Sequence, residues 1–313
     1  VHNILPSSDP ASFTHPDNLA ATCGKCHVGA GSRFTIAPVH TLPDDTPNVV
    51  AHWIRVIYIP LIWVTVIGML LHNLLDMVKK TRTYSMWRRR APEHSVIKER
   101  MARPFRLAHA LAALSFLVLV YTGFALKYPE SWWAELLQFG DNEFRGQAHR
   151  IAAVGLMGAC LFHFGHLAIS ARARGQMAAF LPRIADFKEF SHRLAYNLGR
   201  RADPPAPVRV GYVEKVEYWA ALWGTFVTAI TGLILWFENF TLTWLPGWVP
   251  EAATVLHFLE AVLATLAILI WHFYSVMLDP AVYPMDMTWL TGKPPFSRAE
   301  ERGEVIYEDD VDQ

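Results

Sequence analysis

Long apolar stretches alternate with polar, charged segments along this chain of 313 residues. Five stretches are close to or above the roughly 20 residues that an α-helix needs to cross a bilayer. They run over Trp53–Val78, Leu107–Leu126, Ala148–Ala171, Val216–Trp236 and Ala253–Leu278. The pattern predicts an all-α membrane protein with five transmembrane helices, and the last four of these helices are expected to form one bundle.

The polar segments divide the chain further. Residues 1–50 are proline-rich and predict an irregular arm, residues 51–80 an extra first helix, and residues 279–313 a loop-like tail. The bundle extends over residues 103–278, and its internal segment 172–215 is too polar to cross a membrane. Within that segment, Ile184–Leu198 predicts a short amphipathic helix, because Gly199 and the Pro204–Pro205 pair follow it.

Composition supports a membrane location. Hydrophobic residues make up 52% of the chain and 12 residues are Trp, which is too apolar for an ordinary soluble domain. The 28 basic and 28 acidic residues cancel, and no nucleic-acid partner is expected. The chain begins with Val1 and not with Met. We therefore expect that a secretory signal has been removed from its N-terminus.

The positions of the basic residues predict the orientation. The loops at about 127–147 and 237–252 hold only Lys127 and Arg145 between them. The other two connecting segments are rich in Lys and Arg, so the positive-inside rule places them and the C-terminus in the cytoplasm of a bacterial inner membrane. An odd number of spans then places the N-terminus in the periplasm. The basic residues are Lys79, Lys80, Arg82, Arg88, Arg89, Arg90, Lys98, Arg100, Arg103 and Arg106 in one segment, and Arg172, Arg174, Arg183, Lys188, Arg193, Arg200, Arg201, Arg209 and Lys215 in the other.

A C-x-x-C-H motif lies in the arm, at Cys23 to His27. This spacing is typical of a c-type haem, with Cys23 and Cys26 bound covalently to the haem and His27 as an axial ligand of the iron. A zinc site normally takes four protein ligands, and the third cysteine, Cys160, lies inside an apolar stretch. Because covalent haem attachment is periplasmic chemistry in bacteria, the motif independently predicts a periplasmic N-terminus.

The sixth ligand of this haem is expected to be a histidine. No Met precedes Met69, which excludes Met ligation from the arm. His40 and His52 are the preferred candidates. Since Met raises the potential of a haem relative to His, the c haem is expected to have a rather low potential.

Histidines inside the apolar stretches are the second chemical signal, because ionisable residues in a bilayer are costly and usually functional. His149 and His257 both begin spans that run inward, so they match in depth near the periplasmic side. His272 follows His257 by 15 residues, about 22 Å further in. His109 begins a span that runs outward and therefore matches His272. The simplest result is two b haems, an outer one between His149 and His257 and an inner one between His109 and His272.

His72, His163 and His166 are left over, and three interpretations stay open. His72 and His166, at similar depth, could hold a third b haem, or they could contact a quinone. Alternatively, His163 replaces His109 at the inner haem, or some of the three are packing residues. Asp76 is either a proton relay to an inner quinone site or an interfacial acid among the lysines that follow it.

The last four spans resemble the membrane cytochrome b subunits of formate dehydrogenases (the gamma subunit) and of nickel–iron hydrogenases, over about 180 residues. The resemblance implies the same pairs, His149 with His257 and His109 with His272, and a quinone or menaquinone near the inner haem. In that family a periplasmic iron–sulfur subunit passes electrons to the outer haem. The c-haem arm would take the place of that subunit here. The segments that carry the resemblance are Arg106–His109 to Thr122–Gly123, Gly146–Arg150, Glu217–Trp219 to Thr231–Gly232, His257 and His272.

The resemblance implies a subunit of a respiratory complex that moves electrons between the membrane quinone pool and a periplasmic partner, either a multihaem cytochrome or an iron–sulfur subunit. Two other classes stay open. One is a passive electron conduit between protein partners with no quinone site. The other is a transporter or sensor whose histidines bind metal ions or protons, which would leave the motif at Cys23 to His27 unexplained.

Overall fold

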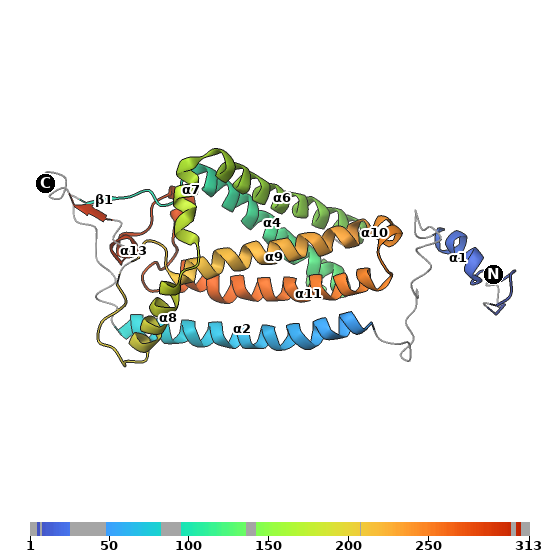
Figure 1. Cartoon of the computed structure of the whole chain (residues 1–313), viewed down its shortest axis with the longest axis horizontal. Helices are drawn as coiled ribbons and strands as arrows, with labels where there is room; N and C mark the ends of the chain where they lie inside the picture. Colours follow the sequence, from blue (N-terminus) through green and yellow to red (C-terminus); the bar gives the residue numbers. More distant parts are fainter. Residues whose placement is uncertain are drawn as a thin grey trace. The chain divides into compact units, whose positions relative to one another are not determined.

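The computed structural model describes residues 5–6, 8–25, 48–82, 95–135, 142–206, 208–301 and 305–307. Within these ranges the chain is almost entirely helical (Figure 1). It divides into two compact units, residues 1–63 with 226–262 and residues 64–225 with 263–313.

Five helices are long and apolar enough to cross a membrane, which confirms the predicted all-α membrane fold. Many of their large apolar side chains are exposed, as lipid-facing side chains would be, and those of Val64, Ile151 and Leu161 are 71–74% exposed. Every predicted span extends by some residues at its start. The bounds are α2 at Val49–Arg82, α4 at Arg103–Lys127, α6 at Asn142–Ile169, α9 at Tyr212–Trp236 and α11 at Trp248–Ala267, which continues through two π-helical segments, η2 at Ile268–His272 and η3 at Tyr274–Leu278.

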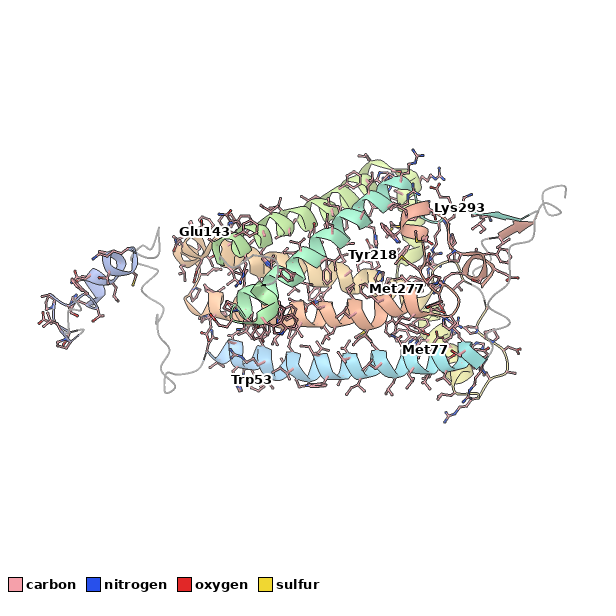
Figure 2. The ribbon with its side chains drawn as sticks, turned by 180° about the vertical axis from the view of Figure 1, so that it is seen from behind. Trp53, Met77, Glu143, Tyr218, Met277 and Lys293 are labelled. Carbon is pink, nitrogen blue, oxygen red and sulfur yellow. The ribbon has the colours of Figure 1, made fainter. Side chains whose placement is uncertain are left out.

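In the second unit, α4 and α6 lie side by side (Figures 1 and 2). A small residue permits close approach at Gly155, where an added Cβ would lie 2.6 Å from the Ser115 hydroxyl on α4. Buried Arg145 near the start of α6 donates to the carbonyls of Ala125 and Ala134, at 3.4 and 3.2 Å. Ala134 belongs to α5 (Trp132–Glu135), so this arginine ties the α4–α6 connection together.

The polar segment after α6 is mostly helical, with α7 at Ala171–Met177, a 3₁₀ turn η1 at Ala178–Phe180 and α8 at Ile184–Asn197. The predicted amphipathic helix is α8. The Asp186 side chain accepts the Arg183 N–H at 2.7 Å at its start, and Gly199 ends it with φ of +73°. A positive φ suits glycine, which carries no Cβ.

Several short elements were missed by the sequence patterns. The arm contains a helix, α1 at Pro16–Cys23, so its prediction as irregular was wrong for these residues. The tail contains α12 at Thr288–Thr291, α13 at Phe296–Glu301 and a strand, β2 at Val305–Tyr307, and so is not simply a loop. Strand β2 pairs antiparallel with β1 at Ser95–Ile97. A further short helix, α10 at Glu238–Trp244, follows α9.

Candidate haem-binding site

His109 on α4 and His272 at the end of η2 face each other, with ring centres 6.3 Å apart. Two imidazoles bound through Nε2 to opposite sides of one metal ion, with metal–nitrogen bonds of about 2.0–2.1 Å, have ring centres roughly 6–6.5 Å apart. The separation therefore suits one iron atom between the two rings.

The His272 ring is oriented by an acid on the neighbouring helix. Its Nδ1 lies 3.5 Å from Glu217 Oε2, and the Ser275 hydroxyl donates to Glu217 Oε1 at 2.9 Å. A carboxylate at Nδ1 favours the proton there and leaves Nε2 free to bind a metal ion. His109 Nδ1 is buried and has no hydrogen-bond partner in the described part of the chain, so no contact there assigns the proton of this ring as Glu217 does for His272.

His149 on α6 is held by a threonine of α4. The Thr122 hydroxyl donates to the Val118 carbonyl at 2.6 Å, so its oxygen accepts from His149 Nδ1 at 2.9 Å. With the proton on Nδ1, Nε2 is free to bind a metal ion. Gly123 supplies the space for the ring, since a Cβ there would lie 3.2 Å from His149 Cε1.

The other unit repeats this arrangement around His257. The Thr231 hydroxyl donates to the Val227 carbonyl at 2.7 Å and its oxygen lies 2.9 Å from His257 Nδ1. A Cβ at Gly232 would lie 3.3 Å from His257 Cε1. The two histidines that the sequence pairs around an outer haem thus have the same Thr-Gly support, one in each unit.

His163 and His166 lie near each other and against Phe105, with ring centres at 5.5 and 5.4 Å. His163 Nε2 also lies 3.1 Å from the Tyr218 hydroxyl. His163 is therefore held by a tyrosine, whereas His109 is the histidine that faces His272.

His72 on α2 has both ring nitrogens in hydrogen bonds. The Asn73 amide donates to the Ile270 carbonyl at 2.7 Å, so Asn73 Oδ1 accepts from His72 Nδ1 at 3.2 Å. The Tyr212 hydroxyl then donates to His72 Nε2 at 2.6 Å. The ring also stacks on Trp271, with centres 4.6 Å apart. Among the described residues no contact joins His72 to His166.

Asp76, one turn after His72, is buried in a charged network and does not lie at the surface. Its carboxylate contacts Lys80 at 2.9 Å and accepts from the Tyr274 hydroxyl at 2.8 Å. The pairing with Lys80 agrees with an acid among the lysines that follow it, but the 8% side-chain exposure argues against an interfacial position.

Only part of the predicted c-haem site lies within the described residues. Cys23 ends α1, while Cys26, His27 and His40 lie outside the described ranges. His52 lies in the first turns of α2, is exposed, and has its ring 5.9 Å from that of Trp53. The c-haem assignment therefore stays a prediction from the motif.

Five membrane-spanning helices with histidines fixed in the tautomer that presents Nε2 define a membrane haem protein of the helical cytochrome b class. The chain belongs to the prokaryotic cytochrome b561 family, whose model matches residues 100–284, more than half of its length. A search of curated proteins found no match. The chain is thus a membrane electron-transfer cytochrome b with haem b as its cofactor, and helix α2 and the arm lie outside the matched residues.

Proposed function

We propose that this chain moves electrons between a periplasmic redox partner and the membrane quinone pool, as the membrane subunit of a respiratory complex. Its cofactors would be one c haem on the arm and two b haems in the membrane, held by His149 with His257 and by His109 with His272. The observation that carries the proposal is the 6.3 Å separation of the His109 and His272 rings.

The distribution of Lys and Arg supports the proposed orientation of the chain across the membrane. The polar segments rich in Lys and Arg follow α2 and α6 and precede α4 and α9, and His109 lies near the start of α4. The positive-inside rule makes this the cytoplasmic side of a bacterial inner membrane. The C-x-x-C-H motif precedes the opposite end of α2 and so would lie in the periplasm.

A bound haem supplies a one-electron iron centre. The chain's own residues fix the ligands: Thr122, Thr231 and Glu217 hold the Nδ1 atoms of three histidines. The apolar helices around them exclude water, which strengthens these polar contacts.

Thr122→Val and Thr231→Val are each expected to raise the midpoint potential of the outer haem b. An acceptor at Nδ1 makes the imidazole a stronger donor to iron and so favours the oxidised state. Loss of one such hydrogen bond, about 1 kcal/mol, corresponds to roughly 40 mV for a one-electron couple. Spectroelectrochemical titration of the purified chain measures the shift.

Thr254→Val is the matched control for this titration. Thr254 lies one turn from His257 and its hydroxyl donates to the Pro250 carbonyl at 2.9 Å, as Thr231 donates to Val227. Because it bonds no imidazole among the described residues, this variant should leave the potential unchanged. Equal potentials in all three variants would contradict the role of the two threonines.

A short-chain quinol analogue tests the quinone link. We expect it to reduce the b haems of the haem-loaded chain, and an inhibitor of quinone sites to prevent the reduction, as followed by b-haem absorbance. Haems that dithionite reduces and the quinol analogue does not would contradict the link. That result would favour the passive conduit between protein partners.

A further inference from the structure

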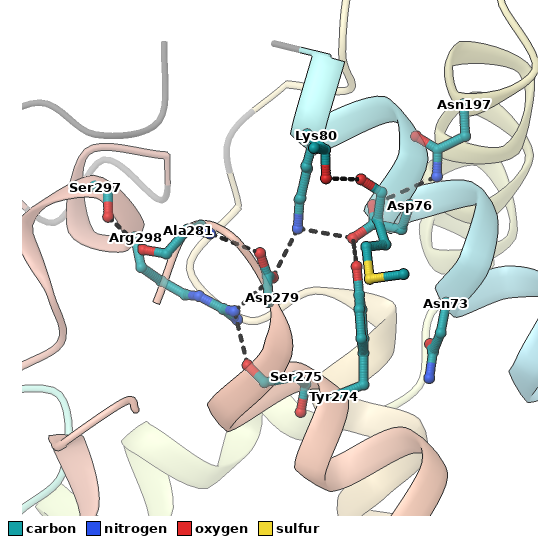
Figure 3. A network of polar contacts seen from close by, with 12 residues as sticks. Asn73, Asp76, Lys80, Asn197, Tyr274, Ser275, Asp279, Ala281, Ser297 and Arg298 are labelled. Atoms are coloured by element: carbon teal, nitrogen blue, oxygen red, sulfur yellow. Dashed lines mark hydrogen bonds and ion pairs between the residues drawn. The ribbon is translucent and has the colours of Figure 1, made fainter. Parts of the chain in front are cut away.

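Four charged side chains are buried together where α2, the end of η3 and α13 meet (Figure 3). Lys80 Nζ lies 2.9 Å from Asp76 and 2.7 Å from Asp279, and Arg298 lies 2.8 Å from Asp279. Their side chains are 5–11% exposed. The two acids and two bases balance in charge, so the buried network is neutral as a whole.

A cavity of about 100 Å³ adjoins this network. Ligand pockets usually measure roughly 300–1,000 Å³, so this space is too small for a quinone ring and its tail. A buried water needs only about 10–15 Å³ of such volume and two to four polar partners. The lining supplies those partners, which include His72, Asp76, Lys80, Tyr212 and Ser275, so several water molecules fit. Trp271 Nε1, in the same lining, is buried without a partner in the described part of the chain and can donate to one of them.

His72 is the group in the lining best suited to carry a proton. Its Nε2 accepts from the Tyr212 hydroxyl, and rotation of that hydroxyl would let Nε2 take a proton from cavity water. The charges near the ring are Asp76 and Lys80 on its own helix and Arg193 on α8. Glu189 on α8 and Glu214 on α9 line the same cavity.

The cavity adjoins the inner histidine pair. Trp271, on which His72 stacks, directly precedes His272. Ser275 lines the cavity and also donates to Glu217, which orients His272. His72 is therefore one tryptophan ring away from the helix turn that carries His272, the side on which the quinone is proposed to react.

Two of the segments that build the cavity, α2 and α13, lie outside residues 100–284 that match the family model. His72, Asp76 and Lys80 come from α2, and Arg298 comes from α13. Figure 2 marks this end of the second unit, with Met77 on α2 and Met277 near the end of η3. The cavity is thus built by residues of the matched region together with segments outside it.

We propose that this cavity is a water-filled proton port, with His72 as the residue that exchanges protons between cytoplasmic water and the quinone. The proposal rests on the proposed quinone link. Reduction of one quinone takes two electrons, delivered singly from the inner haem site, and two protons, which enter through the port and form the two hydroxyl groups of the quinol. Oxidation of a quinol releases both protons by the same route.

His72→Gln tests the port, because glutamine can still bond Tyr212 and does not titrate. Loss of a proton-transfer group typically lowers a rate by 10²–10⁴-fold, so reduction of the b haems by the quinol analogue should slow by about 10²-fold or more. Haem content and the inner-haem midpoint potential should stay unchanged, which separates proton transfer from damage to the haem site. Tyr212→Phe, which keeps the ring and removes only the hydroxyl, should slow the reaction by about tenfold.

His192→Gln on α8 is the matched control, since His192 bonds the Asp203 carbonyl at 3.1 Å and lies outside the cavity lining. Its rate should equal that of the unaltered chain. If the unaltered chain reacts with the quinol analogue and His72→Gln reacts equally fast, the port is overturned while the quinone link stands. If the unaltered chain does not react, both proposals fall. A high-resolution map that shows the cavity without ordered water would overturn the port independently.

Discussion

Replacement of His272 or His109 with leucine is expected to remove the inner haem b and to leave the outer haem b in place. In the proposed site each ring would bind the haem iron, and leucine has no atom that binds iron. The 6.3 Å ring separation leaves room for one metal ion between them. About half of the haem b should be lost from each purified variant, as measured by the reduced pyridine haemochrome and by the low-spin haem signals in electron paramagnetic resonance.

His163→Leu is the matched comparison, because the sequence also allowed His163 as the inner ligand. His163 bonds Tyr218 in the structure, so this variant should keep its full haem content. Loss of haem from His163→Leu together with retention in His109→Leu would show that the inner pair is wrongly assigned.

Lys80→Met should destabilise the folded chain by about 3–5 kcal/mol, because it leaves the buried carboxylates of Asp76 and Asp279 without the cation between them. Thermal unfolding in detergent, followed by circular dichroism, measures the loss. Lys188→Met is the control, since Lys188 is exposed on α8. Equal thermal midpoints for Lys80→Met and Lys188→Met would contradict a stabilising role for the buried ionic network.

The same network predicts how stability depends on pH. Burial pushes the pKa of Asp279 upward, but Lys80 and Arg298 outweigh it, and the pKa lies below its usual range. A carboxyl with a lowered folded-state pKa stabilises the fold above its unfolded-state pKa, and this contribution is lost as the pH falls through the folded-state value. Thermal midpoints should therefore fall on acidification, and by less in Asp279→Asn. An equal fall in both proteins would contradict the contribution of Asp279.

The long helices could be predicted from the sequence because a bilayer requires about 20 apolar residues in each span. The short elements could not be predicted in this way. Helix α1 has eight residues and α12 has four, lengths at which local propensity is too weak to decide the structure. The π-helical segments around His272 are likewise not encoded in the apolar pattern.

The candidate site could be predicted in part. Depth matching predicted that His109 and His272 face each other, and the structure brings these rings together. Thr122 and Thr231 belong to segments that carry the family resemblance, and their hydrogen bonds to His149 and His257 are not apparent from the sequence. The signal that could have found their role is a Thr-Gly pair followed by a histidine, which is 27 residues after Thr122 and 26 after Thr231.

The buried network shows what a sequence pattern leaves out. Asp76 stands four residues before Lys80, a spacing as common on a solvent-exposed helix face as in a buried pair. The group that decides between the two is Asp279, which is 199 residues away from Lys80 in the chain. Only tertiary packing places them together, so local sequence could not distinguish the two interpretations of Asp76.

The pyridine haemochrome spectrum of the purified full-length chain tests the central claim most directly, because it separates haem c from haem b. We predict both types in one polypeptide, with haem b in excess, and haem c retained after denaturation because it is bound covalently to Cys23 and Cys26. A spectrum with haem c alone would contradict the membrane haem sites at the four histidines. A spectrum with haem b alone would contradict the proposed electron path, because that path includes a haem c on the arm.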